Sequence, residues 1–317
     1  FSHAILHFPE SPENSQPPLI LQNPWWAKPF EIFAGLLGTL NRNEADPSSI
    51  LAIMAPLLFG SMFGDVGQGL VLLLAGVLLR KRWPLLRILV ANGASAMVFG
   101  FVFGSMFGRE DIIPALWVHP VASPLPVLMV PLVAGVLIIL LGQVLNAIES
   151  NWRGQWLHWL HVDAPVVALY LGIISAFFLE GSASVLVIVS ALTWYVTGNL
   201  LLAGGNLLAL LTAIAVLIET MMQLVMNTVS FVRVGAFALA HAGLSLAFNV
   251  MADSTGSLVA TILILLLGNV IVIVLEGLVV SIQTTRLILF EFFIRFLQAD
   301  GRVFKPLSAP QAGATHS

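Results

Sequence analysis

Apolar residues in this chain gather in seven long runs, and short stretches rich in polar residues, proline or glycine separate them. The runs cover residues 50–82, 86–108, 127–149, 164–180, 183–203, 206–252 and 257–298. The hydrocarbon core of a bilayer is about 30 Å thick, and a helix needs roughly 20 apolar residues to cross it. The pattern therefore predicts membrane-spanning helices, of which the last two are unusually long.

The first run contains a local break at residues 64–69, which read GDVGQG. Glycine relaxes the backbone and a charged aspartate is costly in lipid, so we expect two short helices around Asp65. This interpretation gives eight spans, and the alternative of one long helix gives seven. Eight spans with a cytoplasmic N-terminus agree better with the positive-inside rule. With this topology Arg109 lies on the external side. The basic residues on the cytoplasmic side are Lys28, Arg42, Arg80, Lys81, Arg82, Arg87, Arg153, Arg302 and Lys305.

The composition agrees with a membrane protein and excludes other classes. Of the 317 residues, 58% are hydrophobic and 9% are charged, against about 25% charged in an ordinary soluble domain. So few charges argue against a soluble enzyme and against a disordered protein. A net charge of −3 gives no basic field for nucleic acid, and the lack of cysteine excludes disulfides and thiolate metal sites. We expect an all-α polytopic membrane protein with about eight transmembrane helices.

The chain divides into three parts by composition. Residues 1–48 are polar and rich in proline, and we expect a linker from a missing N-terminal cytoplasmic domain, since the chain begins at Phe1. Residues 49–300 form the transmembrane domain. Residues 301–317 end in small and polar side chains and are expected to be a cytoplasmic tail.

Ionisable and amide side chains within the predicted spans are concentrated in the last two. The seventh span carries Glu219, Asn227, Ser230, Arg233 and His241, and the eighth carries Asn269, Glu276, Gln283, Arg286, Glu291 and Arg295. Placing an ionisable residue inside a span costs about 3 kcal/mol or more, so each is a functional candidate. The molecule therefore divides into an apolar scaffold and one polar region.

The helical rise indicates how deep these side chains lie. Glu219 lies about 21 Å before Arg233, and His241 lies about 12 Å after it. If Arg233 and Arg286 share one depth on antiparallel helices, then Glu276 lies at the depth of His241 on the external side. Glu219 then lies on the cytoplasmic side. The spacing predicts two polar half-paths that open on opposite sides and are separated by arginines.

The residue types fit these positions. Arginine keeps its charge in any surroundings and repels a passing cation, while it attracts an ionised carboxylate. Glutamate and histidine suit the half-paths because their environment can bring their protonation near neutral pH. Gln283 lies one turn before Arg286, and Ser230 one turn before Arg233, so each can hold a guanidinium. The pattern is typical of an ion translocator rather than of a hydrolase.

Several segments resemble the membrane stator subunit of V-type and A-type rotary ATPases, called subunit a or, in prokaryotes, subunit I. Residues 230–242, SFVRVGAFALAHA, are similar to its S-Y-L-R-L-x-A-L-x-L-A-H-A signature, and residues 59–69, FGSMFGDVGQG, to its F-G-x-M-F-G-D-x-G-H-G segment. Residues 275–277, 286, 290–293 and 301–307 resemble its last helix and tail. The segment 23–31 resembles its junction with the cytoplasmic domain. The matches are colinear from Asn23 to Leu307.

The resemblance implies a subunit that faces a rotating ring of proteolipids (the c-ring, also called subunit K), each with one ion-binding carboxylate. It implies that Arg233 and Arg286 face that carboxylate. It places Glu276 and His241 in the external half-channel, and Glu219 with Asn227 on the cytoplasmic side. Central-stalk and peripheral-stalk subunits are the partners implied for the missing N-terminal domain. No phosphate-binding loop occurs, so no cofactor is expected and ATP chemistry belongs to other subunits.

Other interpretations remain beside this one. A self-contained secondary ion transporter could use the same charges, although the chain shows no internal repeat. A third hypothesis is a structural or assembly protein. Asp65 favours a turn over a ligand, and Glu291 favours a simple pair with Arg295. The absence of a dedicated Na+ cage favours H+, and the short external loops favour a prokaryotic plasma membrane.

Overall fold

The computed structural model describes residues 23–31, 48–83, 86–178, 182–202, 204 and 206–292. Within these residues the chain is helical, apart from turns and one isolated β-bridge between Met106 and Arg109. Five helices are long and apolar enough to cross a membrane, and three apolar helices are shorter. The all-α membrane class is confirmed, while the number of eight spans stays a prediction because of these three short helices.

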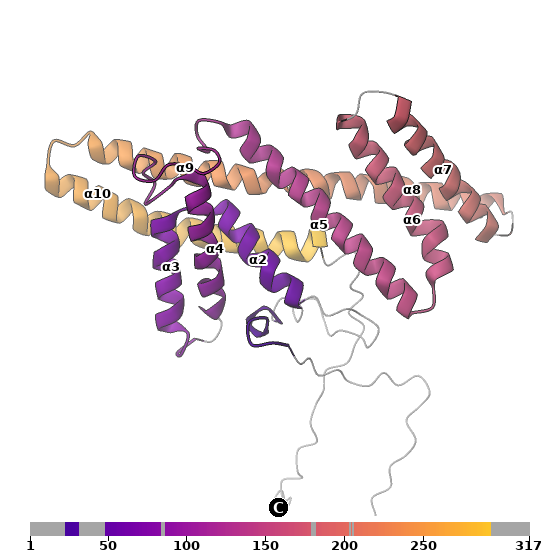
Figure 1. Cartoon of the computed structure of the whole chain (residues 1–317), viewed down its shortest axis with the longest axis horizontal. Coiled ribbons are helices and arrows are strands. Elements are labelled where there is room, and N and C mark those ends of the chain that lie inside the picture. The colour runs from indigo at the N-terminus through magenta and orange to yellow at the C-terminus, as the bar shows by residue number, and fades with distance from the viewer. Residues whose placement is uncertain are drawn as a thin grey trace, which may run out of the picture.

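The first three apolar helices form a compact group (Figure 1). They are α2 (Ser48–Met62), α3 (Val66–Leu79) and α4 (Arg87–Phe103). The predicted break at Asp65 is found: its side chain accepts a hydrogen bond from the backbone N–H of Gln68 and caps α3. Helices α3 and α4 approach closely at Gly93, where an added Cβ would lie 2.5 Å from the backbone nitrogen of Leu73.

Three longer helices follow, α5 (Pro124–Trp152), α6 (Trp156–Phe178) and α7 (Ser182–Leu202). Helices α6 and α7 form an antiparallel pair, and α5 crosses α9 (Figure 1). At this crossing an added Cβ on Gly235 would lie 2.3 Å from the carbonyl oxygen of Val127. A residue larger than glycine would therefore push the two helices apart.

The last two apolar runs form two long, adjacent helical arms. The first arm consists of α8 (Leu207–Ser230) and α9 (Val232–Asp253), which meet at a single turn residue, Phe231. The second arm consists of α10 (Leu258–Ile271), the π-helical segment η3 (Val272–Glu276), α11 (Gly277–Arg286) and a second π-helical segment, η4 (Leu287–Phe292). Both arms run along the long axis of the molecule, across the direction of α3 and α4 (Figure 1).

The length of these arms constrains their orientation. The second arm spans 34 residues from Leu258 to Glu291, which is about 51 Å of helix at 1.5 Å per residue. A hydrocarbon core of about 30 Å accommodates such a helix only at a strong inclination. A strong tilt of the last two spans thus follows from their length and agrees with their course across the other helices (Figure 1).

Of the two expected domain boundaries, the one at residues 48–49 falls at the start of α2, and the one at residues 300–301 lies outside the described residues. Within the expected linker, residues 23–31 form a turn and the short helix η1 (Lys28–Phe30), which packs against α2 through the buried side chain of Phe30. The expected tail, residues 301–317, lies outside the described residues, as does Arg295.

Candidate functional site

Arg233 is braced by polar side chains from both arms. One guanidinium nitrogen, Nη1, donates to Oε1 of Gln283 at 3.1 Å, and Nη2 donates to the hydroxyl of Ser230 at 2.8 Å. The Ser230 hydroxyl in turn donates to Oε1 of Glu291 at 2.7 Å. The chain of contacts therefore runs from a carboxylate on η4, through a serine at the end of α8, to the guanidinium on α9. Hydrogen bonds to charged groups are stronger than neutral ones, so this network fixes the guanidinium in place.

Local helix geometry brings these residues together. Ser230 ends α8 and lies one turn before Arg233, so the turn at Phe231 keeps both on one face. Gln283 and Arg286 lie one turn apart at the end of α11. Glu291 follows within η4, where the wider π-helical turn changes the direction in which later side chains point.

These residues line a groove of about 560 Å³ between the two arms. Its polar lining consists of Asn227, Ser230, Arg233, Arg286 and Glu291, and its apolar lining of Met226, Val229 and Phe290. Arg286 is exposed and makes no hydrogen bond within the described part of the chain. The groove thus presents two guanidiniums against one carboxylate, an excess of positive charge that would attract an anionic group from a partner.

A second polar pair lies further along α9. Nδ1 of His241 and Oε2 of Glu276 are 2.5 Å apart, which is a short, charge-assisted contact. The His241 ring is 3% exposed and stacks at a tilt on Phe63 of the neighbouring group, with ring centroids 4.6 Å apart. Glu276 is the last residue of η3, and its side chain is 18% exposed. The contact agrees with the equal depth that the sequence spacing predicts for these two residues.

Glu219 belongs to neither group. It is exposed on α8, where its carboxylate accepts a hydrogen bond of 3.2 Å from Gln223. It lies about 21 Å before Arg233 along the arm. Of the predicted site residues, the structure therefore brings Arg233, Arg286, Ser230 and Asn227 to the groove, holds Gln283 against Arg233, joins His241 to Glu276, and leaves Glu219 apart.

Glu291 is the residue of this site for which the sequence favoured a different partner. Its expected partner, Arg295, lies outside the described residues, and the observed hydrogen-bond partner of Glu291 is Ser230 on the other arm. The side chain is only 4% exposed. Its position near Arg286 in the last span was the available signal. However, nothing in the sequence indicates the π-helical turn that brings it to Ser230 on the other arm.

Asp65 acts as the turn former that its surroundings predict, and it does more. Besides capping α3, its two carboxylate oxygens accept hydrogen bonds from the Ser105 hydroxyl at 2.7 Å and from the backbone N–H groups of Phe107 and Gly108 at 2.9 and 2.8 Å. Asp65 therefore holds the loop after α4 against the helix pair. Among the described residues, no group of three or more His, Asp or Glu side chains is placed to hold a metal ion.

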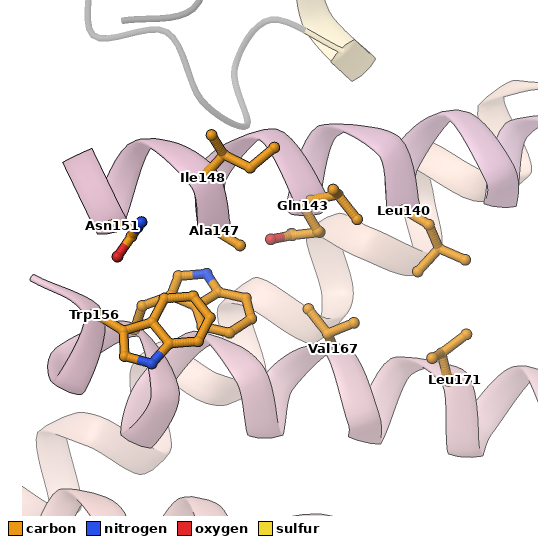
Figure 2. Close-up of a pocket in the computed structure, with 10 residues that line it drawn as sticks. Leu140, Gln143, Ala147, Ile148, Asn151, Trp156, Val167 and Leu171 are labelled. Carbon is orange, nitrogen blue, oxygen red and sulfur yellow. The ribbon is translucent and has the colours of Figure 1, made fainter. Parts of the chain in front are cut away.

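Another groove lies away from all of these charges, between α5 and α6 (Figure 2). Its lining is mainly apolar, with Gln143 and Asn151 on α5 facing Trp156 across the groove. Trp156 and Trp159 stack with ring centroids 5.1 Å apart. Tryptophans are enriched where helices meet the membrane interface, and these two lie at the start of α6.

Comparison with known proteins gives a consistent picture. No family model matches the chain. Curated archaeal proteins do: "A-type ATP synthase subunit I" of Thermococcus kodakarensis is 25% identical over 331 residues, that of Pyrococcus horikoshii 27% over 334, and that of Aeropyrum pernix 28% over 350. These alignments cover 95%, 95% and 90% of this chain. The chain spans about half the length of the relatives it matches, 49%, 49% and 50% respectively.

Proposed function

We propose that this chain is the ion-translocating part of a rotary ATPase stator. The premise is that the chain is a relative of subunit I of the A-type ATP synthases and corresponds to its C-terminal domain. In this proposal the chain passes protons to and from the carboxylates of a rotating proteolipid ring. ATP hydrolysis or synthesis belongs to other subunits of the complex, and the chain itself holds no nucleotide. A prokaryotic plasma membrane is the proposed location.

The observation that carries the proposal is the separation of two polar groups by a braced arginine. His241 and Glu276 form the group on one side of Arg233, and Asn227, with Glu219 further along α8, forms the group on the other side. Arg233 lies about 12 Å from His241 along α9. A fixed guanidinium at this point opposes direct passage of a proton between the two groups. A mobile carboxylate from a partner would therefore be needed to carry the proton past it.

The outer surface of the two arms supports a partner of that kind. Large apolar side chains are exposed along this surface, including Met222, Met226 and Val229 on α8 and Leu278 and Ile282 on α11. They flank the groove that holds both arginines. A ring of apolar helices, each with one carboxylate, would match both the apolar surface and the positive charge of the groove.

The residues then act in sequence for a proton that enters from the external side. His241 and Glu276 share it across their short contact, and Glu276 transfers it to an ionised ring carboxylate, whose neutral form can move through lipid. After nearly a full rotation that carboxylate meets Arg233 and Arg286, whose charge favours its ionised form and so releases the proton. Asn227 and Glu219 line the proposed exit on the cytoplasmic side. The arginines remain protonated throughout.

Proton flux in vesicles tests the proposal. The chain, joined to the expected N-terminal cytoplasmic domain, would be reconstituted with and without the proteolipid ring. The wild type would be compared with Arg233→Gln and Glu276→Gln. Arg87→Gln, which changes an arginine at the start of α4, is a matched control. We expect flux only with the ring, its loss in Arg233→Gln and Glu276→Gln, and wild-type flux in Arg87→Gln. Flux through the chain without a ring, unaffected by Arg233→Gln, would overturn the proposal in favour of a secondary transporter.

A further inference from the structure

A small cavity lies between α9 and the loop that follows α4. Its walls are formed by Gly64, Phe103, Ser105, Gly108, Glu110 and Pro120 on one side and by Ala238, His241 and Ala242 on the other. Its volume of about 10 Å³ is close to what one water molecule requires. Asp65 determines the shape of this cavity, because it accepts the hydrogen bonds of Ser105 and Gly108.

One ring nitrogen of His241 is buried and has no hydrogen-bond partner among the described residues. Its Nδ1 contacts Glu276, and its Nε2 is buried without a hydrogen-bond partner in the described part of the chain. A buried polar atom without a partner is costly, so a water in the adjacent cavity is the expected partner. The imidazole would then connect the cavity on one side of the ring to Glu276 on the other.

Glu110 connects the same cavity to the surface. Its side chain lines the cavity and is also 34% exposed. Its carboxylate lies 3.5 Å from Nδ1 of His119, which is 37% exposed in the same loop. The neighbouring Arg109 is paired with Asp253 at 3.1 Å, so its guanidinium is directed to the end of α9. Glu110 is therefore the titratable side chain that lies both at the surface and at the cavity with His241.

We propose that Glu110 is the outer proton-collecting residue of the path to Glu276, and that the loop of residues 104–122 forms the mouth of the external half-path. The inference rests on the proposed function. Protonated Glu110 gives its proton to the cavity water, and the water gives one of its own to Nε2 of His241. His241 releases the proton on Nδ1 to ionised Glu276. Glu110 ends ionised, Glu276 protonated, and the water and the imidazole neutral.

A neighbouring cavity offers a different route along α9. Gln68, Ser245, Asn249 and Asn269 line it, and it also has a volume of about 10 Å³. Oε1 of Gln68, the hydroxyl of Ser245 and Oδ1 of Asn249 are buried there without partners among the described residues. These side chains are neutral and cannot take up a proton from solution. The route through Glu110 has an ionisable group at its entrance, and the observations favour it.

Substitutions in the assembled ATPase separate the two routes. Glu110→Gln is expected to lower ATP-driven proton pumping about tenfold or more, the usual effect of removing a proton-transfer group. Glu110→Asp is expected to retain most of the rate. Asp111→Asn, which neutralises an exposed carboxylate in the next position, is expected to pump like wild type. Co-purification with the ring would be compared for all variants.

Cysteine accessibility supplies a readout that a purely structural role would not change. The chain has no cysteine, so Ala242→Cys places one thiol at the cavity, Asn249→Cys places one on the neighbouring route, and Leu244→Cys places one on the exposed apolar surface. Externally added Ag+ is expected to inhibit pumping by Ala242→Cys and to spare Leu244→Cys, Asn249→Cys and the wild type.

Two results would overturn the inference. One is wild-type pumping by Glu110→Gln, and the other is inhibition of Asn249→Cys by Ag+ without inhibition of Ala242→Cys, which assigns the path to the neighbouring route. Failure of the proposed function itself has a different signature, because pumping would then also survive in Glu276→Gln.

Discussion

Nδ1 of His241 on α9 and Oε2 of Glu276 at the end of η3 are 2.5 Å apart, although the two residues are 35 positions apart in the chain. The contact joins the two arms at a point about 12 Å from Arg233 along α9. The contact lets a proton on Nδ1 pass directly to the carboxylate, so we expect the two residues to act together.

Replacing His241 tests whether the proton passes between these two residues. His241→Gln can still donate a hydrogen bond to Glu276 but cannot pass a proton on, and His241→Ala removes the contact. We expect both to lower ATP-driven pumping about tenfold or more. His161→Gln, a change of a histidine on α6, should leave the rate unchanged. Pumping by His241→Gln at the wild-type rate would show that a hydrogen bond to Glu276 is sufficient.

Glu291 is expected to act through its charge rather than through its size. Glu291→Gln keeps an oxygen that can accept from Ser230 but removes the negative charge beside Arg233 and Arg286. We predict that pumping falls severalfold while thermal stability changes by less than about 1 kcal/mol. Thr284→Val is the matched control on α11, because the Thr284 hydroxyl is buried without a partner among the described residues. If only Glu291→Leu reduced pumping, a packing role would replace the charge role.

Asp65 is expected to be a main determinant of stability in the first helix group. Asp65→Ala leaves four donors without their acceptor: the N–H groups of Gln68, Phe107 and Gly108 and the hydroxyl of Ser105. We predict a loss of more than about 3 kcal/mol, measured by denaturation of the purified chain in detergent. Ser61→Ala, which removes one hydrogen bond to the Leu58 carbonyl, should cost less than about 1 kcal/mol. Equal effects of the two substitutions would contradict this role.

Two glycines of α9 are expected to respond in opposite directions. Gly235→Ala would place a Cβ 2.3 Å from the Val127 carbonyl oxygen and separate α5 from α9, at a cost of about 1–3 kcal/mol. Gly243→Ala meets no atom within 4 Å and should stabilise the helix by about 0.5–1 kcal/mol. Thermal unfolding of the two variants side by side checks both signs. A stabilised Gly235→Ala would show that the α5–α9 crossing is looser than described.

The sequence predicts the helical class from its apolar runs, the break from the glycines around Asp65, and the proximity of His241 to Glu276 from spacing along regular helices. A glycine in the middle of a helix either lowers helix stability or permits close packing, and at Gly235 the crossing with α5 agrees with close packing.

Spacing arguments are less reliable where the helix is not regular. The π-helical segments η3 and η4 change the direction of the residues after them, and the sequence VIVLE of η3 has no feature that marks it. The partner of Glu291 could not be predicted for this reason. The loop of residues 104–122 lacks periodicity, so its position over His241 depends on the carboxylate of Asp65, 40 positions earlier than Ser105.

The inclination of the second arm has a geometric consequence for the proposed function. Glu276 and Glu291 lie about 22 Å apart along it, and a helix of about 51 Å that spans a 30 Å core converts roughly 18 Å of this separation into displacement parallel to the membrane plane. The external group at Glu276 and the groove at Glu291 are therefore offset sideways as well as in depth. A proton that enters at one and leaves at the other has to travel laterally, and this sideways step is what would turn a downhill flow of protons into torque.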